Sequence, residues 1–335
     1  MTRVEAPSRL HFGLLSVPVA GQTHWPDPDG KPGLPIRSFG GVGLMIDRPG
    51  VVVEATPSPE WSADGIHAER ALDFARTFVG SLPVNEQRCF QVRVECCPPE
   101  HIGLGVGTAL GLSVARALAI ELGHADWDAV ELAKRVGRGR RSAVGVHGFQ
   151  HGGLIVEAGK LPHEEIAPLV GRFEFPEEWR IVLLCPRTVS DWHGLKERAA
   201  FASAVHANDT AVLCQIVLTG ILPAMASRDY VRFAEAIHEF NARAGKAFLN
   251  AQEGVYSSAE VKHLVSLLRE QGVASGQTSW GPTTFAIVRN AEVAQELSSG
   301  IQSACDFLTI EACASKSGAN TSNHGAFGGH QIIRE

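Results

Sequence analysis

The sequence predicts an α+β protein with two domains. Its 335 residues are more than one small core usually needs. Segments with the alternation of strands are interspersed with segments that have the apolar spacing of helices. A charged stretch rich in Glu and Pro at 173–179 separates two such groups. We therefore expect a first domain over residues 1–172 and a second over residues 178–335.

Composition narrows the class of protein and its partners. The chain is 44% hydrophobic and 20% charged, as in ordinary globular proteins, and its net charge of −6 disfavours general binding to nucleic acids or acidic membranes. Arg3 and Glu5 lead into a strand-like pattern rather than a signal peptide, and no apolar run is long enough for a bilayer. The seven cysteines contain no C-x-x-C pair. We expect a reduced, cytoplasmic protein with small-molecule substrates and neither nucleic-acid nor membrane partners.

The first half contains strands and helices in alternation. Arg3 to Val17 predicts one or two strands, interrupted at Pro7–Ser8, and the Pro-rich stretch 19–35 predicts an irregular loop over a cleft. Further strands are expected at 51–55, 89–96 and 154–157, and helices at 64–79 and 127–136, the second helix with Asp126 as its N-cap.

A glycine-rich stretch, Pro98 to Ala119, is the feature most suggestive of a binding site. Glycines at 103, 105 and 107 precede a helix-forming run, so the loop should present bare N–H groups at a helix N-terminus. Such a terminus favours a phosphate, and Thr108 in the first turn can reach that phosphate or a metal ion bound to it. The alternative is an ordinary flexible turn between strand and helix.

A second polar stretch follows the predicted helix at 127–136. Arg138, Arg140 and Arg141 place three permanent cations within four positions, which indicates either a cleft wall or a solvated basic turn. His147 and His151 have the spacing of a helical metal pair, but the glycines among them argue against a helix, so we predict no metal there.

The second half predicts the remaining α+β layer. A mixed-charge segment, 191–198, follows the first strand and includes Glu197. The small and polar tail at 315–329 is expected to be mobile without a ligand. Strands are expected at 180–185, 284–288 and 307–312, and helices over most of 209–247, at 258–271 and at 292–303.

Three motifs together resemble the GHMP kinase superfamily. GLGVGTA, from Gly103, is similar to its phosphate loop, usually PxxxGLGSSAA. APSRLHFGLLSV, from Ala6, resembles its first motif, and TSWGPTTFAIV, from Thr278, its glycine-rich third motif. The resemblance implies a two-domain GHMP-kinase-like fold, with an N-terminal domain like domain 2 of ribosomal protein S5 and a ferredoxin-like C-terminal domain.

Two departures from the kinase pattern point to a particular branch. The kinases usually have PSGxDNA where this chain has SAVGVHG, so His147 stands where an aspartate would be expected, and Val106 and Gly107 replace paired serines. SRLHFGLL, RSFGGVGLMID and RSAVGVHGFQHGGLIVE are instead similar to the β-ribofuranosylaminobenzene 5′-phosphate synthases, which are not kinases. That resemblance implies condensation of phosphoribosyl pyrophosphate with 4-aminobenzoate, release of CO2 and pyrophosphate, a requirement for Mg2+ and a homodimer.

The resemblance and the residue chemistry together give the candidate site. His147, Arg141 and Thr108 are the catalytic candidates, with Thr108 also reaching Mg2+ through a phosphate. An ATP-dependent small-molecule kinase and a non-catalytic phospholigand-binding module remain as alternatives, and 4-aminobenzoate is not distinguished from 4-hydroxybenzoate. The candidate substrate- and phosphate-binding residues are Ser8, Arg9, His11, Arg37, Gly103, Gly105, Gly107, Thr108, Arg140, Glu197, Ser279, Trp280 and Gly281.

Overall fold

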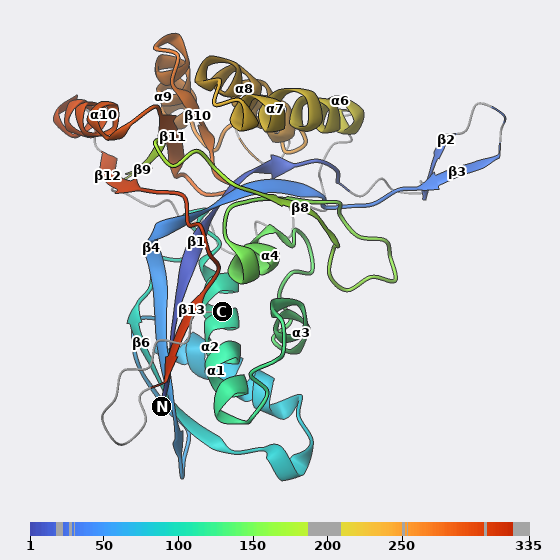
Figure 1. Cartoon of the computed structure of the whole chain (residues 1–335), viewed down its shortest axis with the longest axis vertical. Helices are drawn as coiled ribbons and strands as arrows, with labels where there is room; N and C mark the ends of the chain where they lie inside the picture. Colours follow the sequence, from blue (N-terminus) through green and yellow to red (C-terminus); the bar gives the residue numbers. More distant parts are fainter. Residues whose placement is uncertain are drawn as a thin grey trace.

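The structure, a computed structural model, has two β-sheets, each covered by helices (Figure 1). Helices α1–α4 lie along the first sheet, and helices α6–α10 surround the second sheet at the other end of the molecule. This arrangement confirms the predicted α+β class. The structure describes residues 1–17, 23–26, 29, 31–186, 209–249, 252, 254–304 and 307–323.

The first sheet is built around a long antiparallel pair, β1 and β4. Val4 lies opposite Val53 and Leu10 opposite Leu44, and all four side chains are buried. The strand order is β13-β1-β4-β6-β5, and β7 joins the sheet by pairing with β4 and with β8. The strands are β1 (Thr2–Leu14), β4 (Gly41–Ser58), β5 (Ser62–Gly65), β6 (Cys89–Cys96), β7 (Leu154–Glu157), β8 (Leu169–Phe173) and β13 (Asn320–Asn323).

The helices of this half are α1 (Ala68–Gly80), α2 (Val106–Glu121), α3 (Ala129–Arg135) and α4 (Val144–His151), with a 3-10 turn at Val84–Glu86. Helix α2 is apolar on nearly all sides and fills the core beside β1 and β4. The N-cap of α3 is Asp128, which accepts a hydrogen bond from Glu131 N, so the prediction of Asp126 was wrong.

Helix α4 contradicts the prediction that glycines exclude a helix around His147. The glycines serve close packing there rather than a turn. A Cβ at Gly148 would lie 2.2 Å from Met45 Sδ, and one at Gly145 would lie 3.3 Å from Thr108 Cγ2. The intrinsic cost of glycine in a helix is outweighed by this approach of α4 to β4 and α2.

The second sheet is antiparallel, with the order β10-β11-β9-β12. The strands predicted at 284–288 and 307–312 are confirmed without shift, and Ser258 caps α9 through Val261 N. The elements are β9 (Arg180–Pro186), α6 (Thr210–Ile216), a π-helical segment (Val217–Ile221), α7 (Leu222–Ala226), α8 (Tyr230–Lys246), α9 (Ala259–Glu270), β10 (Ala274–Gln277), β11 (Thr284–Val288), α10 (Ala291–Ala304) and β12 (Phe307–Ala312).

The two halves meet at the end of β1. Phe12 packs on Phe285 of β11 with ring centroids 5.1 Å apart, and Asn241 of α8 donates a hydrogen bond to Phe12 O at 2.7 Å. One apolar core therefore runs from the first sheet into the second. Within the described part of the chain, no helix has the length and apolar character needed to cross a membrane.

Two predictions of irregular structure were wrong. Residues 320–323, in the tail expected to be mobile, form β13 and pair with Thr2 to Glu5 of β1. Within the stretch expected to be an irregular loop, β2 (His24–Pro26) and β3 (Pro32–Pro35) pair as a hairpin that projects from the molecule (Figure 1). The pairing of β13 depends on a strand that is distant in the sequence, and the hairpin depends on backbone hydrogen bonds. Side-chain patterns reveal neither.

Candidate active site

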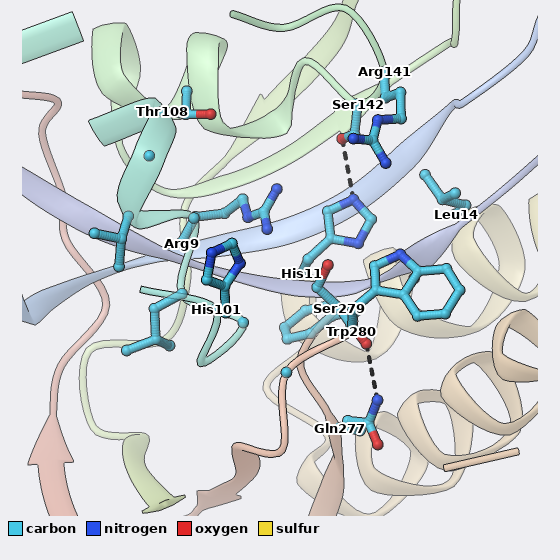
Figure 2. Close-up of a pocket in the computed structure, with 18 of the residues that line it drawn as sticks. Arg9, His11, Leu14, His101, Thr108, Arg141, Ser142, Gln277, Ser279 and Trp280 are labelled. Carbon is cyan, nitrogen blue, oxygen red and sulfur yellow. Dashed lines mark hydrogen bonds between the residues drawn. The ribbon is translucent and has the colours of Figure 1, made fainter. Parts of the chain in front are cut away.

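A cavity of about 680 Å³ lies where the two halves meet. It is lined by the end of β1, the glycine loop 100–108, the arginine-rich turn 137–142, the end of α8 with the loop after it, and residues 277–281. Figure 2 shows Arg9 and His11 of β1 between the glycine loop and the turn that carries Trp280. Three segments predicted separately from the sequence thus contribute to one cavity.

The glycine loop has the bare backbone expected of an anion-binding loop. Gly103 and Gly105 have φ values of 90° and 71°, and His101 between them and β6 has 63°. Gly105 is the N-cap of α2, so the first amides of that helix are directed at the cavity with no side-chain cap over them. A Cβ at Gly103 would lie 2.3 Å from Thr278 O, so this glycine also permits the contact between the loop and the third motif.

Guanidinium groups give the loop end of the cavity a strongly cationic lining. A Cβ at Gly107 would lie 2.5 Å from Arg70 Nη2 and 2.9 Å from Arg138 Nη2, so the missing side chain leaves room for both cations. Glu100, which pairs with Arg70, is the single carboxylate among the described lining residues. Such a cavity suits a ligand with several negative charges. The arginines that line it are Arg9, Arg70, Arg138, Arg140 and Arg141.

The other end of the cavity is aromatic and apolar. Trp280 and Phe248 pack edge to face with centroids 4.1 Å apart, and Phe12, Leu14 and Tyr256 line the cavity with them. The turn before Trp280 is fixed by Ser279 N, which donates to His11 O at 3.1 Å, and by Gln277 Nε2, which donates to Ser279 O at 3.0 Å (Figure 2). A flat aromatic ligand therefore has a preformed wall to stack against.

His11 lies between the two ends and is almost entirely buried, with 3% of its surface exposed. Its backbone N–H donates to Thr278 Oγ1 at 2.9 Å, and its ring Nε2 lies 3.0 Å from Ser142 Oγ. Burial, and secondarily the charge of Arg9, hold the His11 pKa well below its usual value. The imidazole is therefore neutral at pH 7.

The structure separates the predicted site residues into two groups. Ser8 is fully buried in β1 away from the cavity, and Glu197 lies outside the described residues. Arg37 is engaged with Glu164, its Nη1 lying 2.6 Å from Oε2, and is not part of the cavity lining. The residues brought together on the cavity are Arg9, His11, Gly103, Gly105, Gly107, Thr108, Arg140, Arg141, Ser279, Trp280 and Gly281.

The placement of His147 argues against the catalytic role expected for it. It is buried in α4 outside the cavity lining, and its Nε2 donates to Ala167 O at 2.8 Å. Burial lowers its pKa, so it is a neutral core histidine with a satisfied hydrogen bond. His147 matches the aspartate of PSGxDNA in sequence position only. Helix α4 directs its side chain away from the cavity.

Several lining residues were not anticipated from the sequence. Arg70 reaches the glycine loop from α1, which has the pattern of an ordinary amphipathic helix. Glu100 and His101 lie within the glycine-rich stretch Pro98 to Ala119, and Ser142 within SAVGVHG, so their place in these stretches is the signal that could have identified them. Tyr256 follows α8 in a loop with no distinguishing pattern, so only the folded chain reveals it.

The described residues contain no cluster of three His, Cys, Asp or Glu side chains that could hold a metal ion. Glu100 and Thr108 nevertheless provide a carboxylate and a hydroxyl beside the glycine loop. This sparse set of oxygen ligands fits Mg2+, which is commonly held by one or two protein oxygens together with substrate phosphates.

Comparison with known proteins agrees with the architecture. The family described as GHMP kinases C terminal matches residues 221–306. Proteins named beta-ribofuranosylphenol 5'-phosphate synthase are similar over most of the chain. That of Methanothermobacter thermautotrophicus is 29% identical, covering 85% of this chain and 88% of the relative. Those of Archaeoglobus fulgidus and Methanocaldococcus jannaschii are 29% and 26% identical, covering 86% and 84% of this chain and 88% of each relative.

Solved structures share the fold at low sequence identity. Homoserine kinase from Cytophaga hutchinsonii matches with a TM-score of 0.65 and 14% identity, covering 96% of this chain and 97% of that protein. Mevalonate pyrophosphate decarboxylase from Streptococcus pyogenes matches with a TM-score of 0.66 and 11% identity, covering 94% and 97%. The predicted two-domain GHMP fold is thus confirmed, as is the resemblance to synthases of this kind.

Proposed function

We propose that this GHMP-fold chain is a decarboxylating phosphoribosyltransferase. In this proposal it condenses phosphoribosyl pyrophosphate with a benzoate that carries a para amino or hydroxyl group, releasing CO2 and pyrophosphate in the synthesis of a methanopterin-type carrier. The amino compound, 4-aminobenzoate, is the acceptor expected from the sequence. The names of the three relatives refer to the phenol product, so the proposal includes 4-hydroxybenzoate.

The observation that carries the proposal is the division of one cavity into two chemically different ends. At one end, the bare amides of the glycine loop and five arginines match a diphosphate and a sugar phosphate. At the other end, Trp280 and Phe248 match an aromatic ring. The cavity thus offers two adjacent sites, one for a highly charged sugar phosphate and one for a flat aromatic ring.

The chemistry of the proposed reaction needs what these two ends supply. As the bond between ribose C1 and the diphosphate breaks, negative charge grows on the leaving group, and donors fixed around it stabilise this transition state more than the ground state. The ring carbon that bears the carboxylate attacks C1, assisted by the electrons of the para substituent. Loss of CO2 then restores the aromatic ring. Neither a protein nucleophile nor His147 is required.

The proposal includes Mg2+, bound together with the diphosphate. Glu100 and Thr108 are the residues that would hold it. When bound, Mg2+ supplies positive charge to the leaving group. The arginines share that task, because their guanidinium groups remain charged at all relevant pH values. We further propose that the protein is a homodimer.

The decisive assay follows 14CO2 released from carboxyl-labelled 4-hydroxybenzoate or 4-aminobenzoate, with and without phosphoribosyl pyrophosphate and Mg2+. We expect release from at least one acid that depends on both additions. Formation of ADP from ATP and a small alcohol, without release of 14CO2, would instead establish the kinase alternative. Binding of phosphoribosyl pyrophosphate without turnover of either acid would establish the non-catalytic alternative.

A further inference from the structure

Three polar side chains from different strands and loops meet at Gly41, beside the cavity that two of them line. They are His11 of β1, Ser142 before α4 and Glu157 of β7. A Cβ at Gly41 would lie 2.8 Å from His11 Nε2, 3.1 Å from Ser142 Oγ and 3.3 Å from Glu157 Oε1. Gly41 lies opposite Glu157 in the register of β4 and β7, so the sheet itself sets this meeting point. The mechanism proposed above uses neither Ser142 nor Glu157.

The hydrogen-bonding capacity of each group determines which group donates and which accepts in the bonds that link His11, Ser142 and Glu157. Glu157 is fully buried, and its oxygens accept from Ala143 N at 3.2 Å and from Gly159 N at 2.7 Å. Above its pKa of about 7 the Glu157 carboxyl is ionised and only accepts, so in its hydrogen bond with Ser142 the hydroxyl is then the donor. The hydroxyl has one hydrogen, and Ser142 Oγ therefore accepts from His11 at 3.0 Å.

The consequence for His11 is a defined tautomer. Its Nε2 carries the hydrogen that is donated to Ser142, and Nδ1 carries the lone pair. In Figure 2 the ring is bonded to Ser142 through one nitrogen, and the second nitrogen lies on the side of Trp280. The low pKa of His11, caused first by burial and then by Arg9, is consistent with a neutral ring that offers an acceptor. The cavity thus contains an acceptor among many donors.

An acceptor at this place selects among the groups of the proposed ligands. A lone pair repels phosphate and carboxylate oxygens, whereas a hydroxyl or amino group can donate to it. The nearby amide side chains are already bonded, since Asn241 Nδ2 donates to Phe12 O at 2.7 Å and Gln277 Nε2 to Ser279 O at 3.0 Å. The neighbouring aromatic wall of Phe248 and Trp280 would place the ring of the acid within reach of His11.

We propose that Glu157 and Ser142 are positioning residues that hold His11 as the Nε2–H tautomer, so that Nδ1 accepts a hydrogen bond from the para hydroxyl or amino group of the aromatic acid. This inference rests on the proposed function. When the new carbon–carbon bond forms, the ring becomes positively charged and its para substituent a stronger donor. The hydrogen bond is therefore stronger in the transition state than in the ground state, which raises kcat more than it lowers KM. No proton is transferred overall.

The tautomer can be tested without any substrate. We would record side-chain 15N spectra of histidine-labelled protein at pH 8, above the Glu157 pKa of about 7. His147 and His238 are internal references, because each donates Nε2–H to a backbone carbonyl at 2.8 Å. We expect the His11 signal, identified by its loss in His11→Gln, to match this pattern, and Ser142→Ala to abolish that preference. An Nδ1–H form in the wild type, or a tautomer unchanged in Ser142→Ala, would overturn the proposal.

Kinetics test the role toward the acid. Ser142→Ala should lower kcat roughly 5- to 30-fold, as expected for one lost hydrogen bond, with little change in KM for phosphoribosyl pyrophosphate. Ser142→Thr, which keeps the hydroxyl, should restore most of the rate. The matched control is Ser113→Ala, a buried serine of α2 outside the cavity lining, which should keep the wild-type rate. An active wild type with an equally active Ser142→Ala would refute this inference alone, whereas a wild type inactive on both acids would refute the proposed function.

Discussion

Replacement of Gly105 by alanine separates the binding function of the glycine loop from its contribution to stability. Gly105 has a φ of 71°, and alanine in this left-handed region costs about 1–2 kcal/mol. Gly123, at the opposite end of α2, has a φ of 85° and nothing within 4 Å of an added Cβ, so Gly123→Ala is a matched control. Both variants should lose similar stability, about 2–4 °C in Tm for each kcal/mol.

Only Gly105→Ala should impair binding of phosphoribosyl pyrophosphate. Its Cβ would lie 3.1 Å from Arg9 Nε and 3.4 Å from Arg9 Cζ, so the guanidinium must move by a few tenths of an ångström, which disturbs its alignment with a bound phosphate. Loss of one charge-assisted hydrogen bond, about 1.5–3 kcal/mol, corresponds to a roughly 10- to 150-fold higher KM. Thermal unfolding and steady-state kinetics with varied phosphoribosyl pyrophosphate measure the two effects. Equal KM values for the two variants would show that the loop does not hold this substrate.

Three further outcomes follow from the structure. His147→Ala should lower the free energy of unfolding by about 1–3 kcal/mol, because it leaves the buried Ala167 carbonyl without a partner. The same variant should keep kcat within about twofold of wild type. A collapse of kcat in folded protein would instead show that His147 takes part in the reaction. Trp280→Ala should raise KM for the aromatic acid at least roughly fivefold, because the ring loses its aromatic wall. The control is Trp25→Ala on the exposed hairpin. Equal KM values in the two variants would show that Trp280 does not contact the ring. Burial raises the Glu157 pKa from 4.5 to about 7, so its carboxyl takes up a proton on folding, and this contribution to stability is lost as pH rises from about 4.5 through 7. Urea unfolding between pH 5 and 8 should show wild type losing stability relative to Glu157→Gln across that range, whereas parallel curves would contradict the assignment.

The parts of the fold that sequence periodicity determines were predicted well. The strands at Cys89–Cys96, Leu154–Glu157, Thr284–Val288 and Phe307–Ala312 were placed at their observed bounds, because alternating or continuous apolar residues reflect burial directly. The pairing of β13 with β1 was missed, since a short polar strand has no such pattern and depends on a partner more than 300 residues away in sequence.

The site shows the same limit at the level of single residues. Arg9 and His11 were predicted from the resemblance of their motif, and the glycine loop from the spacing of its glycines before a helix; the structure places all of them on one cavity. Arg70 was not foreseen, since a charge on an amphipathic helix is usually solvated and only tertiary packing brings it to Gly107. His147 was expected in the site because it replaces a motif aspartate, but its direction depends on a helix whose glycines signalled a loop.

The most direct measurement of the central claim is a crystal structure with phosphoribosyl pyrophosphate and Mg2+ bound. The diphosphate is expected over the first amides of α2, within hydrogen-bond distance of the Val106 and Gly107 amides and flanked by Arg9 and Arg138, with the ribose directed at Trp280. A diphosphate bound elsewhere, with the glycine loop unoccupied, would contradict the account.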